Sequence, residues 1–161
     1  MYTQDDLTNL NRLLKKRWCL VIIPAALLLA AAVTIFVIGQ LGRSQQLWKV
    51  TTALTLVGGA YFLFFYGVCI RPALIYRKHL RYMLSGRKRT TTGVFKSFSE
   101  DVSDRDGLEC HAMMVNIGQK DDPEDDRLFY YDVYKERPAI PLGTRIIVES
   151  NDKMVSAIQI A

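Results

Sequence analysis

Two long uncharged runs of apolar residues lie close together in the first half of this chain. Trp18–Leu41 holds 24 residues without a charge, Val50–Ile70 holds 21, and only the eight residues Gly42–Lys49 separate them. A helix needs roughly 20 residues to cross about 30 Å of hydrocarbon. A chain of 161 residues has no core wide enough to cover two such helices on every side. The pattern therefore predicts a transmembrane hairpin over residues 18–70, with spans at 18–41 and 50–70.

The basic residues lie beside these runs and indicate an orientation. Residues 1–89 carry 13 Lys or Arg against two Asp, whereas residues 90–161 carry 8 basic and 14 acidic residues. Between the runs lie only Arg43 and Lys49. Because positive flanks stay on the cytoplasmic side, we expect a multi-pass protein of the cell membrane with both termini in the cytoplasm. The basic flanks suit a bilayer with anionic headgroups, and the acidic remainder of the chain predicts no nucleic-acid partner.

A cleaved signal peptide is the alternative interpretation of the first run. Lys15–Arg17 would be its basic region, and Ala30–Ala32 would lie near the cleavage point. The apolar run continues past these alanines to Leu41, which favours a span. If cleavage did occur, the second run would still keep residues 71–161 inside.

Residues 1–17 are predicted to form an N-terminal amphipathic helix. Thr3 and Asp6 have the spacing of a capping pair at its start. Its apolar stripe consists of three leucines at helical spacing: Leu7, Leu10 and Leu14. We expect this stripe to face the acyl chains in the headgroup region, and a binding site for a partner protein is the alternative.

Residues 71–89 are predicted to form a basic juxtamembrane helix and linker. Pro72 should break or restart the helix at its beginning, and Gly86 is expected to end it. Six basic side chains from this segment and the N-terminal helix are expected to contact lipid headgroups: Lys15, Lys16, Arg17, Arg77, Lys78 and Arg81.

The predicted spans carry small residues and no ionisable acid, base or histidine. Slim positions occur in both: Ala25, Ala26, Ala30, Gly58, Gly59 and Gly67. Small residues let transmembrane helices pack closely, whereas ion and proton pathways need ionisable groups at membrane depth. We therefore expect the hairpin to anchor the chain and to associate with a membrane-protein partner or with itself.

From Thr90 onward the composition changes to β-branched and aromatic residues separated by turn formers. Five strands are predicted, at about 91–99, 107–117, 127–134, 144–149 and 153–160. Five short strands in residues 90–161 predict a small cytoplasmic β-barrel of OB or SH3-like type, which gives an α+β membrane protein overall. The side chains expected in its core are Val94, Phe98, Val115, Phe129, Tyr131, Ile146, Val148 and Val155.

This layout over residues 18–161 resembles that of NfeD-type bacterial membrane proteins. Gly93-Val94, followed much later by Pro141-Leu-Gly-Thr-Arg-Ile-Ile-Val148, is a pattern that begins strands in many small barrels. The resemblance implies that the barrel serves in assembly with partner membrane proteins. It assigns no functional residue in this chain.

One predicted strand offers a face for a partner. Phe129, Tyr131 and Val133 alternate with Tyr130, Asp132 and Tyr134. The first set should fill the barrel, and the second set is the predicted partner-binding face.

No residues show the spacing of a catalytic or metal site. Cys110 and His111 must point to opposite faces of their predicted strand, and we expect His111 at the surface or an interface. The five carboxylates in residues 121–126 lack the spacing of a calcium loop, and whether they bind a cation is left open. We predict no catalytic residue, cofactor or metal.

Two hypotheses of function follow from these observations. The first is a non-enzymatic, membrane-anchored interaction or assembly protein that presents its small β-domain at the inner membrane surface. The alternative is a membrane-tethered enzyme or small-ligand sensor with its site in the β-domain. A pocket lined by convergent polar groups would favour the alternative.

Overall fold

The computed structural model describes residues 1–42, 46–118 and 122–161. Its contacts divide the chain into two compact units. The helical unit is Thr8–Arg77, and the sheet unit joins Met1–Leu7 to Lys78–Ala161. Residues 1–7 and 78–89, which the sequence places outside the β-domain, thus group with the strands.

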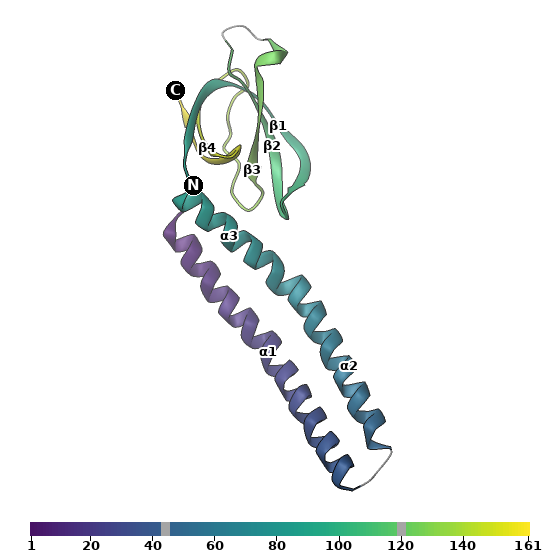
Figure 1. Ribbon diagram of the computed structural model, residues 1–161. Coiled ribbons are helices and arrows are strands. Elements are labelled where there is room, and N and C mark those ends of the chain that lie inside the picture. The colour runs from purple at the N-terminus through teal and green to yellow at the C-terminus, as the bar shows by residue number, and fades with distance from the viewer. Residues whose placement is uncertain (43–45, 119–121) are drawn as a thin grey trace. The chain divides into compact units, whose positions relative to one another are not determined.

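The helical unit is built from long apolar helices. α1 (Gln4–Leu41) is followed by α2 (Leu47–Phe65), a short π-helix η1 (Tyr66–Ile70) and α3 (Arg71–Ser85). α1 and α2 run antiparallel, side by side (Figure 1). By length and composition, α1 and the continuous helix Leu47–Ser85, which comprises α2, η1 and α3, are long and apolar enough to cross a membrane. In the most apolar stretch of each, only 11% and 6% of the residues are buried.

Two helix boundaries differ from those expected. The predicted N-terminal helix and first span form one helix, α1, because no residue between them breaks the backbone hydrogen bonds. The capping pair is confirmed: the Thr3 N–H donates to Asp6 Oδ2 at 2.9 Å, and the Asp6 N–H donates to Thr3 Oγ1 at 3.2 Å. Pro72 does not interrupt the helix. The π-helix η1, which ends at Ile70 just before α3, has a wider turn and accommodates the backbone N–H that proline lacks.

The sheet unit contains the five predicted strands, with small shifts at their ends. They are β1 (Arg89–Arg105), β2 (Leu108–Asn116), β3 (Asp126–Asp132), β4 (Arg145–Asn151) and β5 (Met154–Ile160). The sheet is mixed and closes in a ring in the order β1-β2-β3-β5-β4 (Figure 1). The long β1 closes the ring because its first half pairs with β4 and its second half with β2. Among the described strands, β3 and β5 alone pair in parallel, at Tyr130 and Met154.

The core of the ring is apolar and matches the expected set at seven of its eight positions. Its buried residues are Phe95, Met113, Val115, Phe129, Tyr131, Ile146, Val148 and Val155, with Phe98 partly buried against them. Val94 was expected inside, but Phe95 takes that place. A register shift between Phe95 and Ser97 lets Phe95 and Phe98 face the same side, which strict alternation does not allow.

Candidate functional site

The three residues predicted as a partner-binding face do not form one open surface. Asp132 is 3% exposed, and its carboxylate accepts hydrogen bonds from the Tyr2 hydroxyl at 3.3 Å and the Tyr134 N–H at 2.9 Å. Tyr130 is half-buried, with the Arg105 guanidinium 4.3 Å from the centre of its ring. Tyr134 is 66% exposed. Of these three positions, Tyr134 alone is largely open to a partner.

The chain's own first residues cover this face. Tyr2 O–H lies 3.2 Å from His79 Nε2, and Lys135 Nζ donates to Asp6 Oδ2 at 2.8 Å. The hydrogen bond from Lys135 lowers the pKa of the Asp6 carboxyl, and burial lowers the pKa of the His79 imidazole. This contact group, called here the N-terminal clasp, ties residues 1–7 and the end of α3 to the region after β3.

The sequence alone did not indicate the N-terminal clasp. Its members are separated by up to 130 positions along the chain. Each is an ordinary polar residue in its local segment, and only the closure of the ring brings them together. The one local signal was the capping pair, which places Asp6 at the first turn of α1.

Cys110 and His111 lie on opposite faces of β2, and neither is set up as a nucleophile. Cys110 packs with Met83 and Met154, and burial raises the pKa of its thiol to about 11. His111, which was expected at the surface or an interface, is 8% exposed. It shares the inward face of β2 with Met113 and is paired with Tyr131, and within the described residues its Nδ1 has no hydrogen-bond partner.

The six basic residues predicted to contact lipid belong to both units. Lys15, Lys16, Arg17 and Arg77 lie in the helical unit, whereas Lys78 and Arg81 lie in the sheet unit. Arg77 is half-buried and the other five are exposed. Arg17 Nη1 donates to the Cys69 carbonyl at 3.0 Å, which links α1 to η1. Contact with headgroups stays a prediction for these residues. Leu14 of the expected lipid-facing stripe is 3% exposed and therefore packs inside the protein.

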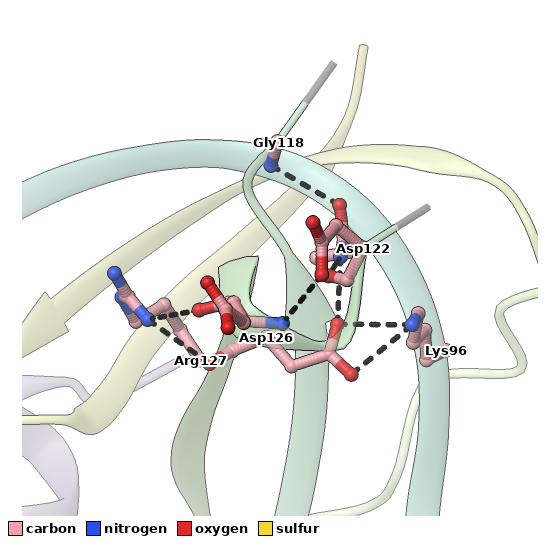
Figure 2. Close-up of polar contacts among 7 residues, drawn as sticks. Lys96, Gly118, Asp122, Asp126 and Arg127 are labelled. Atoms are coloured by element: carbon pink, nitrogen blue, oxygen red, sulfur yellow. Dashed lines mark hydrogen bonds and ion pairs between the residues drawn. The ribbon is translucent and has the colours of Figure 1, made fainter. Parts of the chain in front are cut away.

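Two carboxylates of the acidic loop, those of Asp122 and Asp126, accept hydrogen bonds within the protein (Figure 2). Asp122 Oδ1 accepts the Glu124 N–H at 3.0 Å and caps a short 3-10 helix. Asp126 accepts from Asn116 Nδ2 at 2.7 Å and from Lys96 Nζ at 3.0 Å, and these bonds lower the pKa of its carboxyl. Asp121 lies outside the described residues. Among the described residues no cluster of three metal-ligating side chains occurs.

A shallow apolar groove runs between α1 and α2 in the helical unit. Its volume is about 360 Å³, and it is lined by Ile22, Ala25, Ala26, Leu29, Leu54, Thr55, Gly58, Gly59 and Phe62. Four of the lining residues are small: Ala25 and Ala26 of α1, and Gly58 and Gly59 of α2. A Cβ atom added at Gly59 would meet nothing within 4 Å, so this part of the groove is open.

Comparison with known proteins finds no matching family model, no matching curated protein and no matching solved structure. The resemblance to NfeD-type proteins therefore stays an expectation about the order of the elements.

Proposed function

We propose that this chain is a non-enzymatic membrane protein that anchors its β-domain at the inner membrane surface and assembles with a transmembrane helix of a partner. The observation that carries the proposal is the groove between α1 and α2. Two apolar helices that leave their small residues uncovered offer a surface on which a third helix can pack closely. The third helix comes from another membrane protein or from a second copy of the chain.

The sheet unit is proposed to be a small barrel of the OB type. Its ring order, with β5 between β3 and β4, and the parallel pair between β3 and β5 support this choice over an SH3-like barrel. OB domains are general binding modules, so this type is compatible with a role in interaction. In such a chain the barrel is the part available to cytoplasmic partners, and exposed Tyr134 is the residue proposed to meet them.

Both termini are proposed to lie in the cytoplasm. The support is the charge asymmetry, since the basic residues flank the hairpin and only Arg43 and Lys49 lie between its two apolar runs. With the three native cysteines replaced, single cysteines are introduced at Trp48, near the short connection, and at Ser97. In intact cells an impermeant thiol reagent should label only position 48. Labelling of position 97 in intact cells would reverse the orientation.

The proposed assembly predicts a loss of association when the groove is filled. Gly59→Leu should abolish association in the membrane, because the added side chain occupies the groove without clashing inside the hairpin. Gly67→Leu is the matched control: it adds the same bulk at another open glycine, in the adjoining η1 and outside the groove. Association is measured as energy transfer between labelled copies and as proteins co-purified with the tagged chain. Equal association in both variants and the native chain would contradict the assembly role of the groove.

The second candidate function, a small-ligand sensor, is favoured by one observation. The sheet unit contains a hollow of about 520 Å³ lined by charged side chains. Volumes of this size are typical of ligand sites.

A further inference from the structure

Four basic side chains converge on one hollow of the sheet unit. The hollow, here called the basic hollow, is lined by Arg87, Arg89, Arg127 and Lys153 together with one carboxylate, Asp152. Tyr82, Ile117 and Leu128 are among its other lining residues. The surrounding segment, residues 90–161, carries an excess of acidic residues. A concentration of positive charge at this one place is therefore a local feature and does not follow from the composition of the domain.

The basic hollow exists because the ring is incompletely paired there. β3 pairs with β5 only at Tyr130 and Met154, where the Tyr130 N–H donates to the Lys153 carbonyl at 2.8 Å. β5 begins at Met154, so the earlier residues of β3 have no β5 strand beside them. The start of β1, the end of β4 and the β4–β5 turn surround this opening.

The positive charges of the basic hollow are not neutralised within the described parts of the chain. Arg127 donates to two backbone carbonyls, of Glu124 and Asp126, each at 3.2 Å, which hold its guanidinium but leave its charge uncompensated (Figure 2). Across residues 1–42, 46–118 and 122–161, no carboxylate pairs with Arg87, Arg89 or Lys153. Asp152 also lines the hollow, and its Oδ2 lies 3.8 Å from Nη2 of Arg105, a cation that does not line it.

The turn that carries Lys153 is strained. Asp152 and Lys153 both have positive φ, 46° and 69°, in the two-residue turn between β4 and β5. Glycine or asparagine is favoured at such positions, because a side chain with a Cβ atom is strained in the left-handed conformation. The chain thus places a lysine at the rim of the basic hollow where glycine would be more stable. Strain of this kind concentrates at binding sites.

We propose that the basic hollow binds a phosphorylated ligand carrying at least two negative charges. Arginine suits phosphate because its planar fork of donors matches two phosphate oxygens, and lysine adds a point charge. The apolar side chains of Ile117 and Leu128 and the ring of Tyr82 line the remaining volume and can contact the body of such a ligand. The phosphate belongs either to a soluble organic phosphate or to a phosphomonoester lipid headgroup. This site is independent of the assembly role proposed for the hairpin.

The test uses the full chain in nanodiscs of phosphatidylcholine. Inorganic pyrophosphate is titrated by calorimetry as the soluble probe, and discs containing phosphatidic acid serve as the lipid probe, with retained lipid measured by mass spectrometry. Saturable binding of pyrophosphate in neutral discs identifies a soluble ligand. Retention of phosphatidic acid without pyrophosphate binding identifies a headgroup. If the native chain binds neither probe, the proposal is wrong.

The substitution Lys153→Gly distinguishes an effect on ligand binding from an effect on folding. The variant should weaken binding of the probe by about tenfold or more, because one charge-assisted contact is lost. Its melting temperature should stay equal or rise, because glycine relieves the positive φ at this position. Arg145→Gln is the control, since it removes one exposed cation of the sheet unit that does not line the basic hollow. An equal loss of affinity in both variants would show a response to net charge and overturn the site. Association through the groove should be native in both variants, so failure of this proposal is distinguishable from failure of the assembly role.

Discussion

Phe129→Ala should unfold or nearly unfold the sheet unit. Phe129 is 6% exposed and lies on β3 among the aromatic and aliphatic residues of the ring core. Removing a buried phenyl ring leaves a cavity and costs about 3–5 kcal/mol, whereas a whole domain is stable by only about 5–15 kcal/mol. Hydrogen exchange of the β2 and β3 amides in the full chain should accelerate by roughly two to four orders of magnitude, at 1.4 kcal/mol per tenfold.

The neighbouring residue provides the control for this prediction. Leu128 is 37% exposed on the opposite face of β3, so Leu128→Ala should cost about 1 kcal/mol or less. If instead Leu128→Ala were the more destabilising change, Leu128 and not Phe129 would face the core. The register in which β3 pairs with β2 would then be wrong as well. Exchange in the helical unit, Thr8–Arg77, should be the same in both variants and in the native chain, since the residues of the ring core all belong to the sheet unit.

The elements that were predicted correctly are those with a strong local pattern. The two apolar runs form long apolar helices. They could be predicted because a long run without charges is recognised from consecutive residues alone. The five strands follow from alternation and from turn chemistry such as Asp106 and Gly107, which both have positive φ in the β1–β2 turn. The capping pair of Thr3 and Asp6 was predictable for the same reason, because both residues lie within one helical turn.

The features that were missed depend on residues far apart in the chain. The exchange of Val94 for Phe95 in the core results from an irregular pairing between β1 and β2, and no local pattern marks its position. His111 is buried because β2 is covered on its inner face by the closed ring. Asp132 is contacted by Tyr2, which comes from the other end of the chain. The residues of β3 alone therefore could not show that Asp132 is buried.

The basic hollow depends both on a local sequence pattern and on contacts between residues far apart in the chain. The cluster at Arg87 and Arg89 is visible in the sequence as a basic linker after α3. Its convergence with Arg127 and Lys153 requires the ring order that brings the start of β1, the start of β3 and the β4–β5 turn to one opening. The basic charge of Arg87 and Arg89 was therefore predictable from the sequence, as part of a linker, whereas no local pattern connected it with Arg127 and Lys153.

Gly93→Ala should destabilise the ring at the point where β1 changes partners. Gly93 pairs with Ile146 of β4, and the next residue, Val94, pairs with β2 as well as with β4. A Cβ atom at this position would lie 2.5 Å from the Asn116 carbonyl oxygen and 2.6 Å from Val115 Cγ1. Because one of these neighbours is backbone in a paired strand, the clash is relieved only by moving β1 away from β2.

Glycine is therefore required here by the close approach of two backbones, which is a common role of glycine within a strand. Gly93→Ala should cost about 1–3 kcal/mol, and Gly93→Val should cost more, because a larger side chain increases the overlap. Thr92→Ala, at the exposed neighbouring position, should change the free energy of unfolding by about 0.5 kcal/mol or less. Chemical unfolding of the full chain, followed by the near-ultraviolet circular dichroism of the tyrosines, measures all three. Native stability in Gly93→Ala would show that β1 and β2 do not approach closely at this position, and that the ring closes elsewhere along β1.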